Sequence, residues 1–456
     1  MLNNTLVERS GDTPDARADR VKHLPGWGKV EDQVYSGYVT VDSEAGRALF
    51  YILVEAQGGS AGNPLILWTN GGPGCASSGG GFIREHGPWF PNAFVEQNGL
   101  RRNEYAWNRA ASVVYLDQPA FTGFSYSNRS SDRYAADETT GHDARLFLER
   151  FMKRFPRLRN APLWLSGESF GGHYVPQLAQ MIVDGNAKPG AQQINLKGFL
   201  LGNPSTESEI DNTGRIEYWY EHRLISTETR TEIYKECDLE EVIIGPGDLV
   251  DMRQPKSKCL DGIRRAKREF GDTDIYDVYE DVCRYDSKGG RGTGEDPSPR
   301  PCDLDPCIGD EAVRYLSMPA VQEALHANTT GLPYPYDVCG IRGLEYDRSD
   351  QLRTMLPTYQ ALIAKKQLRI LVFSGLFDGM EPHLGTELWL AKLNMTLTTP
   401  TRPWFDPLEA NVEAGQVTEY DGITYATIKG AGHMAAYTQP ARTLQMMTRW
   451  VNNEPL

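Results

Sequence analysis

The hexapeptide Gly-Glu-Ser-Phe-Gly-Gly at residues 167–172 constrains the fold of this chain more than any other feature. It contains Gly-x-Ser-x-Gly, the pattern of a nucleophile elbow, in which a serine occupies a sharp turn between a strand and a helix. The pattern alone is weak, since roughly one chain of this length in six contains it by chance. Its flanks strengthen it, because APLWLS is typical of a buried strand and FGGHYVPQLAQM of a helix. We therefore predict that Ser169 is an activated nucleophile.

Short apolar runs alternate with helical patterns along most of the chain. Strands are predicted at 34–41, 48–56, 64–70, 112–117, 161–166, 194–204, 368–378 and 423–433, and helices at 137–155, from 170, from 384 and from about 440. This alternation predicts an α/β protein with a mostly parallel central sheet flanked by helices. An α/β-hydrolase core with an insertion would account for all 456 residues.

The character of the sequence changes twice and so predicts four regions. Residues 1–22 are polar and lack an apolar period, as expected of a loose tail. Residues 23–204 form the first part of the core and residues 316–456 the second. The charged, cysteine-rich residues 205–315 between them predict an inserted cap region stapled by disulfides, with a flexible Gly/Pro/Ser loop near 287–301.

An aspartate and a histidine that follow the elbow in the sequence complete the order Ser, Asp, His that is typical of α/β hydrolases. Asp378 closes an apolar strand, and His433 follows the last predicted strand. Loops at the carboxyl ends of parallel strands meet at one edge of the sheet, so the three residues can converge there. Ser169 would attack a carbonyl, His433 would move its proton, and Asp378 would orient His433. A lone histidine of this kind is more often structural; three residues in this order favour catalysis.

A second glycine-rich loop follows the strand at 64–70, with the sequence Asn-Gly-Gly-Pro-Gly at residues 70–74. Glycines let a backbone approach a ligand closely and present its N–H groups. We predict that the backbone N–H groups of Gly72 and Phe170 form an oxyanion hole. Glu168 argues against this expectation, because a carboxylate beside an oxyanion is unfavourable. Its presence needs a functional explanation.

Composition and cysteine usage limit the possible partners and cellular locations of the protein. The net charge of −14, with no basic stretch that carries interleaved aromatics, argues against a nucleic-acid partner. No apolar run approaches the roughly 20 residues of a membrane span, and the amino terminus shows no signal-peptide pattern. Seven cysteines, five of them between 237 and 307, and sequons at Asn3, Asn128, Asn328 and Asn394 indicate the secretory pathway, extracellular or vacuolar, and candidate glycans.

The odd number of cysteines leaves one thiol free or paired outside the chain. Zinc is the rival to disulfides, but CDLDPC at 302–307 has four residues between its cysteines and no nearby histidine, which disfavours it. We predict no metal and no cofactor.

The motifs WTNGGPGC, DQPAFTGFSYS, GESFGGHYVP and GAGHM, together with LPGW and YSGYVTV near the start, resemble the serine carboxypeptidase family. They are spread in order from about residue 24 to 440. The resemblance implies an α/β-hydrolase fold with an inserted cap, and removal of single residues from peptide C-termini at acidic pH. Its catalytic residues fall on Ser169, Asp378 and His433. The resemblance also implies a disulfide between Cys75 and Cys339, and dimers occur in the family.

The same resemblance gives Glu168 a purpose. Family members bind the C-terminal carboxylate of the substrate with an asparagine, a glycine and two glutamates, which match Asn70, Gly71, Glu168 and Glu85. Two carboxyl groups held close together cannot both ionise cheaply, so the pKa of one rises. The neutral carboxyl can then donate a hydrogen bond to the substrate carboxylate.

Departures from the family pattern leave the side-chain preference open. They are GCASS in place of GCSS, Leu376 in place of an acidic residue, Ala435-Ala436 after GAGHM, and EPHLG at 381–385. Three other functions compete with the peptidase: an acyltransferase that resolves the acyl-enzyme with an alcohol, a non-catalytic binding protein, and an ordinary esterase. Asn70 favours the peptidase over the acyltransferase, the intact triad disfavours the binding protein, and an esterase would not need Glu168.

Overall fold

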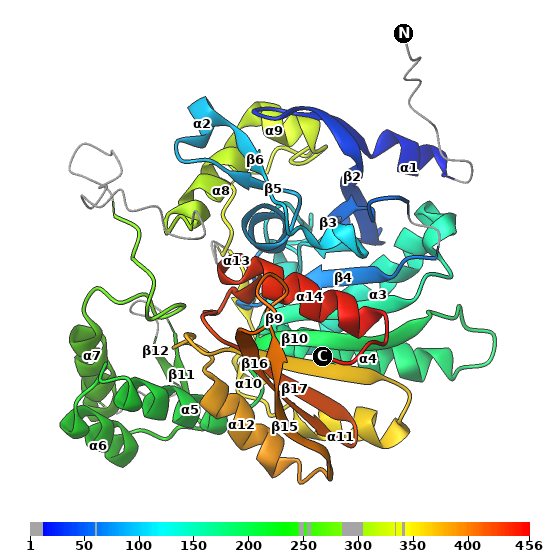
Figure 1. Cartoon of the computed structure of the whole chain (residues 1–456). Helices are drawn as coiled ribbons and strands as arrows, with labels where there is room; N and C mark the ends of the chain where they lie inside the picture. The colour runs from blue at the N-terminus through cyan, green and yellow to red at the C-terminus, as the bar shows by residue number, and fades with distance from the viewer. Residues whose placement is uncertain are drawn as a thin grey trace.

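A single eleven-stranded sheet forms the centre of the computed structural model, which describes residues 12–59, 62–245, 250–252, 257–284, 304–332, 334–339 and 343–456 (Figure 1). In spatial order its strands are β1 (Arg20–Leu24), β2 (Gly28–Asp42), β3 (Arg47–Val54), β7 (Ser112–Leu116), β4 (Leu65–Thr69), β9 (Leu163–Ser169), β10 (Leu196–Pro204), β14 (Arg369–Gly375), β17 (Ile423–Ile428), β16 (Glu413–Tyr420) and β15 (Leu397–Phe405). The six strands from β7 to β17 run parallel, and the strands at both margins pair antiparallel. The predicted α/β fold is confirmed, with its parallel part in the middle.

Helices cover both faces of the sheet because its central strands are apolar on both sides. One core cluster joins the sheet to α3 (Asp137–Arg154), α4 (Gly171–Asn186), α11 (Leu356–Lys365) and α12 (His383–Lys392). The other joins it to the π-helical segment η1 (Ser78–Glu85), α8 (Ile308–Ser317), α9 (Pro319–Ala324) and α14 (Pro440–Val451). The strands therefore stay rigid where their carboxyl ends carry the functional loops.

Residues 12–22, the part of the expected loose tail that the structure describes, form ordered elements. Helix α1 (Pro14–Ala18) is capped by Thr13, whose side chain accepts a hydrogen bond from the Ala16 N–H. Strand β1 starts at Arg20 and pairs with β2, and the side chains of Ala16 and Val21 are fully buried. These two small apolar residues anchor the segment, but they are too few to produce a recognisable period in the sequence.

The predicted insertion contains a helical unit beside the sheet, drawn in green in Figure 1. It comprises α5 (Ser208–Glu221), α6 (Thr227–Glu236), α7 (Ser257–Phe270) and the hairpin of β11 (Val242–Ile244) and β12 (Val250–Met252). These elements share a small core of their own, and a disulfide between Cys237 and Cys259 staples it. The domain boundaries themselves remain a prediction.

Two further disulfides lie outside this helical unit. The predicted bond between Cys75 and Cys339 is confirmed, and it ties the glycine-rich loop to the later core across 264 residues of sequence. The bond between Cys283 and Cys307 removes Cys307 from the CDLDPC pair, whose Cys302 lies outside the described residues. Within the ranges given above, no helix combines the length and apolar character needed to cross a membrane.

The sequon at Asn3 lies outside the described residues, whereas the other three can be located. The side chains of Asn128 and Asn394 are exposed. The side chain of Asn328 is half-buried, and its Nδ2 donates to the Gln322 Oε1 at 2.9 Å. Exposure makes the first two the better glycan acceptors, and glycosylation stays a prediction for all of them.

Candidate active site

The turn at Ser169 has the geometry of a nucleophile elbow. Ser169 ends β9 with a φ of 56°, a left-handed value that is unfavourable for a residue with a side chain, and α4 begins two residues later. Its carbonyl accepts a hydrogen bond from the Ser205 N–H at 2.9 Å, which fixes the turn against the end of β10. The surrounding packing therefore holds the serine in a strained position, as is common at functional sites.

Asp378 and His433 are hydrogen-bonded to each other. The Oδ2 atom of Asp378 lies 2.7 Å from the Nδ1 atom of His433, and both side chains are buried. The other carboxylate oxygen, Oδ1, accepts the backbone N–H groups of Met380 at 2.7 Å and Glu381 at 3.1 Å. Because Asp378 can only accept when ionised, this geometry places the imidazole proton on Nδ1 and leaves Nε2 as an acceptor.

The surroundings of His433 favour its charged form. Burial lowers the pKa of this imidazole, but the carboxylates of Asp378, Glu168 and Glu381 raise it to about 9. The two glutamates contribute only while they are ionised, and burial raises the pKa of Glu381 to about 8. Below neutral pH Glu381 is protonated and no longer supports the imidazolium, so the basicity of His433 is lower there.

Asn203 links the loops that carry the three residues, and the sequence analysis missed it. Its Nδ2 donates to the His433 carbonyl at 2.5 Å, and its Oδ1 accepts the Gly375 N–H at 2.8 Å. Asn203 is fully buried at the end of β10, beside Ser169 at the end of β9. Its place at the carboxyl end of a parallel strand was the signal that could have revealed it.

The glycine-rich loop lies directly against the elbow. A Cβ atom at Gly71 would come within 2.8 Å of both the Glu168 carbonyl oxygen and the Ser169 Cβ, so this approach requires a glycine. Gly72 has a φ of 109°, which also suits glycine alone. Among the described residues, the backbone N–H groups of Gly72 and Phe170 donate to no acceptor, as an empty oxyanion hole would require.

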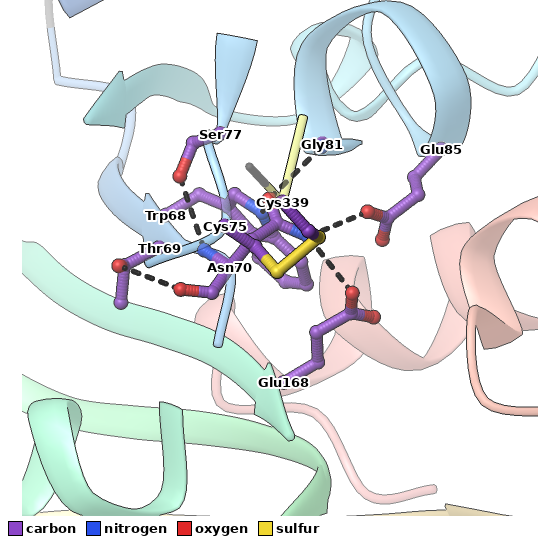
Figure 2. The surroundings of a disulfide bond; sticks show 9 residues. All are labelled: Trp68, Thr69, Asn70, Cys75, Ser77, Gly81, Glu85, Glu168 and Cys339. Carbon is purple, nitrogen blue, oxygen red and sulfur yellow. Dashed lines mark hydrogen bonds between the residues drawn. A yellow bond between two sulfur atoms is a disulfide. The ribbon is translucent and has the colours of Figure 1, made fainter. Parts of the chain in front are cut away.

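Asn70, Glu85 and Glu168 form a buried cluster beside the elbow (Figure 2). The Asn70 Nδ2 donates to the Oε1 atoms of both glutamates, each at 2.8 Å. Its Oδ1 accepts the Trp68 indole N–H at 2.7 Å and the Gly81 N–H at 3.0 Å, which fixes the orientation of the amide. One amide thus holds two carboxyl groups that come from η1 and from the elbow.

The two carboxyl groups have raised pKa values. Burial raises the pKa of Glu85 well above its usual range, and the charge of Glu168 raises it further. Burial also raises the pKa of Glu168, although the charge of His433 opposes this. The pair therefore holds a proton at acidic pH, on Glu85. Its Oε2 is buried and has no hydrogen-bond partner among the described residues, so a proton there remains available to a ligand.

Ile275 and Tyr276, from the predicted insertion, contact the loops that carry Asp378 and His433. The sequence did not indicate these contacts. The His433 N–H donates to the Tyr276 carbonyl at 2.6 Å, and the Gly379 N–H donates to the Ile275 carbonyl at 2.9 Å. The Tyr276 ring lies 5.1 Å from the imidazole, measured between centroids. From α5, Arg215 pairs with Glu381 at 3.0 Å. The inserted region therefore helps to position Asp378 and His433.

No metal centre is evident in the described ranges, where no three His, Cys, Asp or Glu side chains are grouped as ligands. The site offers a serine, a histidine and an aspartate at one sheet edge, two free backbone N–H groups, and a paired carboxyl cluster. Such a set can carry out nucleophilic acyl transfer on a substrate that bears a carboxylate.

The sheet, the elbow and the two loops define an α/β hydrolase. The family model described as serine carboxypeptidase matches residues 25–453. "Serine carboxypeptidase-like 25" of Arabidopsis thaliana is 35% identical over 474 residues, covering 100% of this chain and 96% of that protein. "Serine carboxypeptidase 24" of the same plant is 36% identical over 466 residues, with coverage of 100% and 96%. The chain belongs to the serine carboxypeptidase family.

A solved structure is similar over nearly the whole length. Kex1Δp, a prohormone-processing carboxypeptidase from Saccharomyces cerevisiae, aligns with a TM-score of 0.74 at 19% identity, over 97% of each chain. At this identity the likeness establishes the fold, including the mostly parallel sheet flanked by helices.

Proposed function

We propose that this protein is a serine carboxypeptidase that releases C-terminal amino acids from peptides through an acyl-enzyme, best at acidic pH. The observation that carries the proposal is the cluster of Asn70, Glu85 and Glu168 next to the nucleophile, with both glutamates bonded to one amide at 2.8 Å. A protonated Glu85 and the adjacent Gly71 N–H can bind a terminal carboxylate, which an endopeptidase or esterase does not need to recognise.

The proposed chemistry assigns to these residues the usual roles of a serine triad. The Ser169 Oγ attacks the carbonyl of the last peptide bond, and the His433 Nε2 takes its proton. Asp378 keeps Nδ1 protonated and stabilises the imidazolium, while the Gly72 and Phe170 N–H groups receive the oxyanion. His433 then protonates the leaving amino acid, and water hydrolyses the acyl-enzyme by the same steps in reverse.

The first test is hydrolysis of a blocked dipeptide with a free C-terminus and of its amidated counterpart from pH 4 to 8. We expect cleavage of the free acid alone, strongest near pH 4–6, since the amide lacks the negative charge and the second acceptor oxygen of a carboxylate. Equal cleavage of both would contradict recognition of the carboxylate. No cleavage of either, with Ser169 still labelled by a fluorophosphonate, would indicate acyl transfer to an alcohol instead.

The pH dependence of KM should come from the two glutamates. As pH rises through their raised pKa values, both ionise and repel the substrate carboxylate, so we expect KM to rise about tenfold or more from pH 4.5 to 7.5. Over the same range kcat should change less than KM, because Glu381 raises the pKa of His433 only while it is ionised. Glu85→Gln, which keeps a donor at every pH, should flatten the rise in KM. A flat KM in the unmodified protein would contradict the proposal.

The acyltransferase is not favoured, because the carboxylate cluster that it would not need is complete. The three disulfides and the exposed sequons at Asn128 and Asn394 support a secretory route, extracellular or vacuolar. The partners of such an enzyme are peptides or proteins with a free C-terminus.

A further inference from the structure

Arg84 is a cation at the carboxylate cluster that makes no direct contact with a counter-ion among the described residues. It is the next-to-last residue of η1 and directly precedes Glu85. No hydrogen bond or ion pair joins its guanidinium to another described residue, and its Nε is buried without an acceptor. A guanidinium has five N–H donors, and leaving a buried one unmade is costly. Arg215 nearby, in contrast, is paired with Glu381. Arg84 therefore has unused capacity to bind an anion.

The neighbours of Arg84 place it on the side of the leaving residue. Its charge opposes the effect of burial, which raises the pKa of Glu85, of Glu168 and of Tyr276. Glu85 and Glu168 are the proposed site of the terminal carboxylate, and the Tyr276 ring packs against His433, which protonates the leaving amine. A residue within electrostatic reach of these groups lies near the amino acid that is released.

The segment that carries Arg84 packs against two helices, one of which follows His433. Segment η1 packs against α8 and against α13 (Ala435–Thr438), which begins two residues after His433. On α8, a Cβ atom at Gly309 would lie 3.4 Å from the Arg84 Cζ, an ordinary van der Waals distance, so the guanidinium lies close to the start of this helix. The charge of Arg84 acts on both glutamates of the cluster, but their Oε1 atoms accept from Asn70, and neither carboxyl group forms an ion pair with Arg84 in the described structure.

We propose that Arg84 binds the side-chain carboxylate of the leaving residue, so that the enzyme prefers peptides ending in aspartate or glutamate. This inference rests on the proposed function. The terminal α-carboxylate already has Glu85 and the Gly71 N–H as donors, whereas the planar fork of Arg84 matches a second carboxylate. A C-terminal lysine or arginine would place a like charge against the guanidinium and would be disfavoured.

The test compares three blocked dipeptides that differ only in the last residue, Glu, Gln or Lys, at pH 5.5. We expect kcat/KM for Glu to exceed that for Gln by about tenfold or more, and Lys to be the poorest, since a charge-assisted pair is strong. At pH 4 the glutamate side chain is partly protonated, and its advantage should shrink. Arg84→Met, of similar length without charge, should abolish the preference for Glu and improve cleavage of Lys.

Arg109→Met is the matched control, because Arg109 is exposed and donates only to the Glu104 carbonyl within the described structure. Its ratios should equal those of the unmodified protein, and thermal unfolding checks that both variants fold. Equal cleavage of the Glu and Gln peptides by the unmodified protein overturns the inference. So does an equal loss on all three peptides in Arg84→Met, which would assign Arg84 to the α-carboxylate. If no peptide is cleaved, the proposed function fails first and the inference falls with it.

Discussion

Ser169→Ala is expected to lower kcat for a free-acid dipeptide about a million-fold, the loss typical when the nucleophile of a serine triad is removed. This corresponds to about 8 kcal/mol of lost transition-state stabilisation. The Gly72 and Phe170 N–H groups and the cluster around Asn70 remain, so a small residual rate and nearly unchanged substrate binding should persist. Steady-state kinetics at pH 5 and loss of fluorophosphonate labelling measure the effect.

Ser166→Ala is the control for this change, since Ser166 lies on the same strand, is fully buried, and its Oγ has no partner among the described residues. It should keep full activity. Ser169→Ala should also keep its stability, because alanine at a φ of 56° is strained as serine is. Ser169→Gly should be equally inactive but more stable by about 1 kcal/mol, since glycine relieves the strain. Activity in Ser169→Ala above about a thousandth of the original would exclude Ser169 as the nucleophile.

Much of the fold could be predicted because its central strands are continuous apolar runs. Strands β4, β7 and β14 are formed by the runs PLILWT, SVVYL and RILVFSG. Helices cover both faces of these strands, so their burial dominates any local preference. The strands at the margins of the sheet were harder to predict. Strand β15 is mostly exposed and carries two prolines, and the sequence gives it no strand pattern; it forms because it pairs with β16.

The candidate site divides in the same way. Ser169, Asp378 and His433 follow strands or sit in recognisable loops, and their order along the chain could be compared with a known arrangement. Asn203 and Tyr276 act through backbone groups of residues distant in sequence, and no local pattern reports such contacts. Arg84 could not be singled out from the sequence either. Its buried Nε lacks an acceptor among the described residues, and this can be seen only when the neighbouring side chains have been placed.

Glu168 beside the oxyanion hole raises a question of charge that the cluster resolves. A full carboxylate there would oppose the developing oxyanion, but Glu168 shares its amide donor with Glu85, and the pair holds a proton at acidic pH. With substrate bound, the terminal carboxylate and the ionised member of the pair carry two negative charges, of which Arg84 offsets one. The acidic optimum is thus the cost of recognising a carboxylate next to a reaction that creates negative charge.

Asp378→Asn is expected to lower kcat about ten-thousand-fold, with KM little changed. The Oδ1 atom is fixed by the N–H groups of Met380 and Glu381, so an asparagine keeps its carbonyl there and turns its NH2 toward the His433 Nδ1. That nitrogen must then accept, and the imidazole proton moves to Nε2, where it can no longer take the serine proton. Kinetics at saturating peptide measure the loss.

Asp143→Asn provides the comparison, since Asp143 is also a buried aspartate in an ion pair, with Arg47 at 2.7 Å, but on α3 and remote from the elbow. It should lose some stability and keep kcat. In Asp378→Asn the fall in kcat should persist across pH 4 to 8, because the fault is the tautomer of His433 and not its charge. If kcat recovered at acidic pH, Asp378 would act mainly by raising the pKa of His433, and the orienting role assigned to its Oδ2 would be wrong.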